Sequence, residues 1–130
     1  SLGFHDGVWQ AVQGEDVIAI VDLEKVIEID SIFSNFYRYQ DAWIFTPTYV
    51  EFSASIDGDH YEVISQKEFK SATLKNDAQD IVKVNSGKLM GVRARYIKMR
   101  AVNSGLCPDW HAAATEPTWL FCDEIIIRAK

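Results

Sequence analysis

Apolar and polar residues alternate along much of this chain, and the period of the alternation is two. The clearest stretch is Val50–Ile56, where apolar side chains fill every second position and Glu or Ser side chains lie between them. This pattern predicts a strand that buries one of its faces. Asp57-Gly58 follows at once and predicts a hairpin turn, so that a second strand should run through Tyr61–Ile64.

Several other stretches have the same β-rich character. The segment 16–23 is almost uniformly apolar, which predicts a central strand covered on both faces. The alternation in 92–102 changes parity, which predicts a bulge near Tyr96-Ile97. The remaining expected strands are 26–37, with a break near Asp30-Ser31, 81–84 and 119–127. The best helical pattern, at 76–84, is weak. The strands together predict an all-β, antiparallel β-sandwich.

Length and composition narrow the class of protein. A chain of 130 residues predicts a single domain, and 48% apolar with 25% charged residues is ordinary globular usage. Thirteen basic against nineteen acidic residues give a net charge of −6, which argues against a nucleic-acid partner. The longest apolar runs are far shorter than the roughly 20 residues of a membrane span. The chain starts without an initiator Met or a signal-peptide pattern, so we interpret it as a fragment lacking its first few residues.

The sequence contains no residue set that predicts catalysis. Asp123 and Glu124 are neighbours on an expected strand, so their carboxylates should point to opposite faces. Cys107 and His111 flank a Pro in an expected loop, where their spacing fixes no geometry. Two cysteines are too few for a disulfide scaffold or a structural zinc site, and we expect Cys107 and Cys122 to be free thiols.

Two tryptophans on expected loops suggest a binding role instead. Trp43 precedes a strand, and Trp110 lies between Asp109 and His111 in the long segment 103–117. A sugar ring offers an apolar face and a rim of hydroxyls, which proteins hold with one stacked aromatic ring and a few directional polar groups. The alternative is that each Trp plugs an end of the sandwich and binds nothing.

Three residues on the expected strands have their own interpretation. Trp9 and Trp119 lie at strand edges, where packing in the core is the favoured role. Glu124 should share a strand face with Leu120, Cys122 and Ile126, so its carboxylate needs a partner. An Arg side chain and a calcium ion are the two candidate partners.

Motifs spread over nearly the whole chain resemble one known family. The broad match consists of Ile20–Leu23, Pro47–Phe52, Ser55–Gly58 and Ala94–Lys98. These segments resemble the discoidin-like (coagulation factor 5/8 type C) domain, whose bacterial members include carbohydrate-binding module family 32. A narrower match consists of Asp6–Gln10, Trp43–Phe45 with Pro47, Pro108–His111, and Trp119–Phe121 before Asp123–Ile125. It resembles the C-terminal module of bacterial family 20 β-N-acetylhexosaminidases, the chitobiases.

The resemblance implies an eight-stranded jelly-roll sandwich that binds sugar through loops at one end. It implies a non-catalytic module that holds an attached N-terminal glycosidase domain near an N-acetylhexosamine- or galactose-type glycan. Such enzymes are exported, so the expected location is the periplasm or the cell exterior. With the loop chemistry, it makes Trp43, Asp109, Trp110 and His111 the expected sugar-binding residues. A structural or protein-interaction domain that packs on the catalytic domain and binds no sugar is the alternative.

The resemblance also implies a structural calcium ion, but with an incomplete set of ligands. Ser1 and Glu124 match the family's Ser/Thr and Glu ligands, whereas its Asp-Gly loop would lie before Ser1. Calcium takes about six to eight oxygen ligands, so we expect weak binding or none in this fragment. Glu24 is a second departure, because it stands where the family usually turns with Gly.

Overall fold

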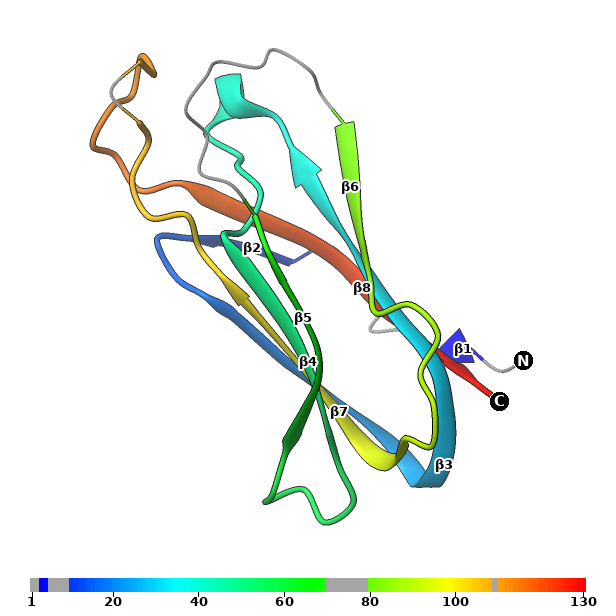
Figure 1. Cartoon of the computed structure of the whole chain (residues 1–130). Coiled ribbons are helices and arrows are strands. Elements are labelled where there is room, and N and C mark those ends of the chain that lie inside the picture. The colour runs from blue at the N-terminus through cyan, green and yellow to red at the C-terminus, as the bar shows by residue number, and fades with distance from the viewer. Residues whose placement is uncertain (1–2, 5–9, 70–79, 109) are drawn as a thin grey trace.

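The computed structural model describes residues 3–4, 10–69, 80–108 and 110–130 (Figure 1). Its elements are β1 Gly3–Phe4, β2 Gln10–Gln13, β3 Val17–Arg38, the 3-10 helix η1 Gln40–Ala42, β4 Tyr49–Ser55, β5 Glu62–Glu68, β6 Asp80–Asn85, β7 Arg93–Val102 and β8 Trp119–Ala129. All pairings between these strands are antiparallel. The expected all-β, eight-stranded jelly-roll sandwich is therefore confirmed for this part of the chain.

The long strand β3 belongs to both layers of the sandwich. Its first half, 17–28, pairs with β7, which continues through β4 to β5. Its second half, 29–38, pairs with β8 and β6, and β8 also pairs with β1 and β2. Figure 1 shows β3 turning back at the lower end of the molecule, so that its two halves lie in facing layers. One continuous strand thus fixes the two sheets relative to each other.

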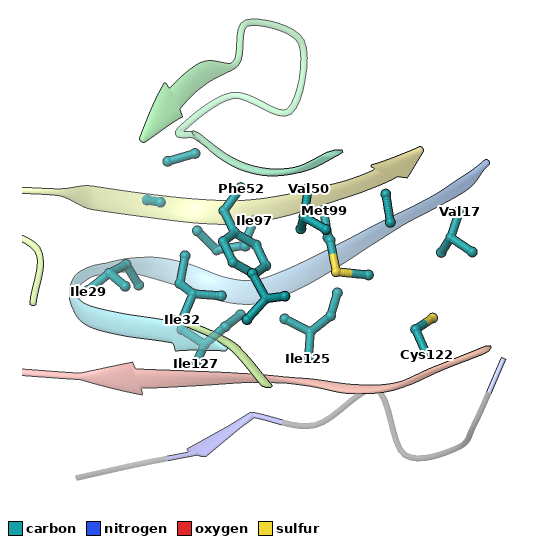
Figure 2. Packing of buried hydrophobic residues seen from close by; sticks show 14 of the residues in the cluster. Val17, Ile29, Ile32, Val50, Phe52, Ile97, Met99, Cys122, Ile125 and Ile127 are labelled. Carbon is teal, nitrogen blue, oxygen red and sulfur yellow. The ribbon is translucent and has the colours of Figure 1, made fainter. Parts of the chain in front are cut away.

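The core lies between these two layers (Figure 2). One layer contributes large side chains such as Phe52, Ile97 and Met99, and the other contributes side chains such as Phe36 and Ile125, all of them buried. Burial of a side chain of this size stabilises the fold by about 1.5–3 kcal/mol. The alternating pattern that predicted the strands is therefore the pattern that fills the core.

The bend in β3 is stabilised by a turn around Glu24. This residue has a φ of 70°, in the left-handed region that favours glycine. The Asp22 carboxylate accepts the Glu24 backbone N–H at 2.8 Å and pairs with the Arg95 guanidinium at 2.9 and 3.1 Å. The hydrogen bond from Arg95 lowers the pKa of Asp22 below its ordinary value. Glu24 therefore has the left-handed backbone conformation that favours Gly, which is the residue that the resembled family usually has at this position.

The expected details of the strands are confirmed only in part. The irregularity expected near Tyr96-Ile97 is present in the pairing with β3, between the pairs Asp22–Tyr96 and Ile27–Ala94, although the extra residues belong to β3. The burial along β7 changes parity at the same place, between Ala94 and Ile97. The stretch 16–23 is not covered on both faces, because Ile18 and Ile20 are 62% and 55% exposed. This half of β3 pairs with β7 alone, as an edge strand with one open face. The expected break near Asp30 is confirmed as a register shift in the pairing with β8.

The end of the chain also departs from simple alternation. Along β8, Leu120 and Cys122 are buried at one parity, whereas Ile125 and Ile127 are buried at the other. Ile126 is only half-buried, so it does not continue the buried face of Leu120 and Cys122. Trp119 is half-buried outside the core cluster, with its ring centroid 6.0 Å from that of Phe121. The core role expected for Trp119 is therefore wrong, because its parity on β8 is opposite to that of Leu120.

The remaining expectations about local structure concern the segment 76–84, Trp9 and the two cysteines. Residues 80–84 form part of β6, so the strand expected at 81–84 is confirmed and the weak helix is wrong there. Residues 76–79 and Trp9 lie outside the described residues. Cys107 and Cys122 are both buried, and they are not joined by a disulfide, as expected. Burial also raises the pKa of the Cys107 thiol.

Candidate functional site

The candidate site lies at the end of the sandwich formed by η1 with its following loop and by the segment 103–118 (Figure 1). Trp43 ends η1 in the left-handed region, with a φ of 65°, and its N–H donates to the Gln40 carbonyl at 2.9 Å. A non-glycine residue in this conformation costs roughly 1–2 kcal/mol, so the surrounding contacts must hold it there. The tight turn sets the direction in which the Trp43 side chain leaves the backbone.

Backbone hydrogen bonds attach this turn to the first residue of β8. The Trp119 N–H donates to the Trp43 carbonyl at 2.7 Å, and the Phe45 N–H donates to the Trp119 carbonyl at 3.1 Å. Phe45 is buried, and its ring centroid lies 6.3 Å from that of Trp110 and 5.7 Å from that of His111. The Trp43 turn is thereby held against the sheet.

His111 connects the second loop to η1. Its Nε2 lies 2.5 Å from the Gln40 carbonyl oxygen, and its Nδ1 accepts the Ala113 N–H at 2.9 Å. Because Nδ1 accepts, the proton of the neutral ring is assigned to Nε2, which donates to Gln40. The residue is 9% exposed, so both ring nitrogens are used inside the protein. Sequence reasoning had proposed it as a direct donor to sugar; its contacts instead fit a positioning role.

These elements surround a hollow of about 250 Å³, lined by Asp41, Trp43, Trp110, His111, Ala112 and Ala113. The two Trp residues are half-buried, and the Trp110 and His111 ring centroids are 5.8 Å apart. The structure therefore brings together three of the four residues predicted from the sequence. The fourth, Asp109, lies outside the described residues.

Sequence reasoning missed the other three lining residues. Asp41 is exposed and sits two residues before Trp43, inside the segment already singled out for its Trp. Ala112 and Ala113 follow His111, and their small side chains leave room beside the rings. The signal for these residues in the sequence was the run of Ala that follows Trp110 and His111. The described lining residues offer aromatic surface and the exposed Asp41 carboxylate as an acceptor, which suits an uncharged ligand with hydroxyl donors.

The expected calcium ligands cannot be placed. Ser1 and the Glu124 side chain lie outside what the structure describes, although Glu124 belongs to strand β8. Among the residues that are described, no group of three or more His, Cys, Asp or Glu side chains could hold a metal ion. Calcium binding therefore stays a prediction of the family resemblance. Within the same residues, no helix has the length and apolar character needed to cross a membrane.

Comparison with known proteins gives structural neighbours but no sequence family. No protein-family model matches the chain, and no curated protein matches it. The likeness to known proteins is therefore one of fold.

The neighbours include carbohydrate-binding modules of the discoidin-like type. The C-terminal domain of a chitobiase from Bacteroides fragilis superposes with a TM-score of 0.50 at 23% identity, over 88% of this chain. This chain spans less than two thirds of that domain, 64% of its length. A family 32 module of a family 89 glycoside hydrolase from Clostridium perfringens gives a TM-score of 0.59 at 16% identity, over 96% of this chain and 81% of its own.

A third neighbour is a family 32 module from a family 31 glycoside hydrolase of the same bacterium. It matches with a TM-score of 0.52 at 14% identity, over 98% of this chain and 75% of its own. The fold of this chain is thus the fold of family 32 carbohydrate-binding modules.

Proposed function

We propose that this chain is a non-catalytic carbohydrate-binding module whose sugar site is the hollow beside Trp43 and Trp110. The observation that carries the proposal is the position of the two rings, which come from separate loops and line one hollow at the end of the sandwich. In this site the apolar face of a pyranose stacks on a Trp ring. The Asp41 carboxylate accepts hydrogen bonds from its hydroxyls.

His111 acts in this proposal as a positioning residue. Its two hydrogen bonds fix the segment 110–113 against η1, and its ring packs on Phe45 beside Trp110. A stacking site gains affinity when its aromatic rings are held in place before the ligand arrives. Asp109, predicted as a direct polar contact, keeps that proposed role.

The attached partner in the proposal is an exported glycoside hydrolase, which the module holds at its glycan. The support is the chitobiase domain among the structural neighbours, together with the Pro108–His111 and Trp119–Phe121 motifs. N-acetylhexosamine- and galactose-type glycans are the proposed ligands. Export places the module in the periplasm or outside the cell.

A sandwich that packs on its catalytic domain without binding sugar is the second candidate function. One observation favours it: Ile18 and Ile20 lie exposed on the open face of β3. Adjacent exposed aliphatic residues are typical of surfaces that contact another domain. The two candidates differ in whether the isolated chain binds sugar, which a titration decides.

Calorimetric titration of Trp110→Ala with chitobiose and with a β-galactoside tests the proposed site. Loss of the stacked ring should weaken binding by about 1–3 kcal/mol. Trp119→Ala is the matched control, because Trp119 is also half-buried but does not line the hollow. It should leave the affinity per folded molecule unchanged. Equal affinity of wild type and Trp110→Ala would remove Trp110 from the site.

A further inference from the structure

The β4–β5 hairpin lies at the end of the sandwich opposite η1 (Figure 1). A second hollow, larger than the first, lies beside this hairpin. It measures about 450 Å³, within the range of small-molecule sites. Its walls come from the hairpin, from the start of β5 and from Gly91–Arg93 at the start of β7. Nothing in the proposed function uses this end of the molecule.

His60 is held in a fixed position at this hollow by a preformed loop. The Asp57 Oδ1 accepts backbone N–H groups of Asp59 and His60 at 2.8 and 2.9 Å, and its Oδ2 lies 2.8 Å from the His60 Nδ1. The backbone N–H of His60 is the main cause that holds the pKa of Asp57 well below its ordinary value. Since this carboxylate only accepts, the ring proton facing it is on Nδ1, and Nε2 is left for a ligand.

Two further polar side chains line the hollow without partners of their own. Glu62 and Arg93 are both exposed, and neither forms an ion pair or side-chain hydrogen bond with another described residue. They offer an acceptor and a donor of hydrogen bonds. Ile64 and Val92, both partly buried against the core, add apolar surface between them.

The balance of these groups selects the class of ligand. The carboxylates of Asp57 and Glu62 outnumber the guanidinium of Arg93, so the hollow disfavours an anion. Among the described residues, no group of three or more His, Cys, Asp or Glu side chains could hold a metal ion, so nothing in the described lining points to a metal ligand. An uncharged molecule with many hydroxyls and an apolar face can hydrogen-bond to the polar side chains of the hollow and pack on its apolar side chains at the same time. A pyranose has this character.

We propose that the hollow at the β4–β5 hairpin is a second saccharide-binding site, with Arg93 as hydrogen-bond donor and Glu62 and His60 as acceptors. The site does not share a residue with the aromatic hollow, so it stands independently of the proposed function. Two sugar sites at opposite ends make one module bivalent. A bivalent module binds a surface of many glycans more tightly than either site alone would.

An amide NMR titration of the whole chain with methyl β-D-galactopyranoside and with N-acetyl-D-glucosamine tests the proposal. We expect at least one sugar to shift the Gly91 amide, and Arg93→Ala to weaken that binding at least about tenfold. Lys88→Ala, which removes an exposed cation outside the hollow, should leave it unchanged. The Ala113 amide reports the aromatic hollow separately, and Trp110→Ala should affect only that response.

Three results would overturn the second site. One is the absence of any Gly91 shift with either sugar at about 50 mM, well above a millimolar Kd. Another is a sugar response at Gly91 that survives both Arg93→Ala and Glu62→Gln. The third is a Gly91 response to glycine, a zwitterion, with none to the sugars, which would assign the hollow to amino acids or peptides. None of these results depends on what Ala113 shows, so the failure of one site does not conceal the other.

Discussion

Replacement of His111 by Ala should destabilise the protein and distort the aromatic hollow. The change removes the hydrogen bonds to the Gln40 carbonyl and from the Ala113 N–H. It also removes a ring that is 9% exposed and packs on Phe45 and Trp110. Two lost hydrogen bonds contribute about 0.5–1.5 kcal/mol each, and the Ala113 N–H that loses its acceptor and the space left by the ring add to this. We expect the free energy of unfolding to fall by about 2–4 kcal/mol.

Urea unfolding followed by Trp fluorescence and by circular dichroism measures this loss. Lys88→Ala is the control, because that side chain is exposed and lines neither hollow. It should change stability little. Affinity for sugar, corrected for the folded fraction, should fall in His111→Ala because the Trp110 segment loses its attachment. A decrease in unfolding free energy below about 0.5 kcal/mol would refute the positioning role.

Three further predictions concern the scaffold. Glu24→Gly should raise the free energy of unfolding by about 0.5–1 kcal/mol, because it relieves the left-handed strain at a φ of 70°; unchanged or lower stability in urea unfolding would contradict this. Asp22 has a lowered pKa, so its contribution to stability is present above its ordinary pKa of 3.8 and is lost as the pH falls below it. Asp22→Asn should therefore lower stability at pH 7 and flatten the acid dependence below about pH 4, and an unchanged acid profile would count against the Arg95 pairing. Thiol titration of the denatured chain should find both Cys107 and Cys122 reactive, whereas a count of zero would mean a disulfide.

Local pattern was enough to predict most of the strands, although not β1 or β2. In β4 the alternating apolar residues Val50, Phe52 and Ala54 are buried in the core, as the pattern predicts. The alternation in burial ends there, because Ser53 and Ser55 are buried as well and Ile56 is exposed.

Reasoning from local alternation failed where burial depends on distant parts of the chain. Ile18 and Ile20 look like core residues by composition, but they lie on the face of β3 opposite to the buried Val17 and Leu23, and this face is exposed. The changes of burial parity between Ile29 and Ile32 and between Cys122 and Ile125 likewise coincide with register shifts between distant strands.

The candidate site, too, could be predicted from the sequence only in part. The residue types Trp43, Trp110 and His111 predicted aromatic binding chemistry, and the fold brings them to one hollow. The role of His111 was not predictable, because its partner Gln40 lies 71 residues away in the sequence. The hollow at the β4–β5 hairpin was not predictable from the sequence for a similar reason. Its residues Glu62 and Arg93 come from two strands, β5 and β7, that both pair with β4.

A glycan array probed with the purified chain and with Trp110→Ala tests the central claim most directly. We expect the purified chain to bind glycans that end in N-acetylhexosamine or galactose units. We also expect Trp110→Ala, at the same folded concentration, to lose most of this signal. Binding of the wild-type chain to none of the glycans, with the protein shown to be folded, would contradict the claim that this sandwich is a carbohydrate-binding module.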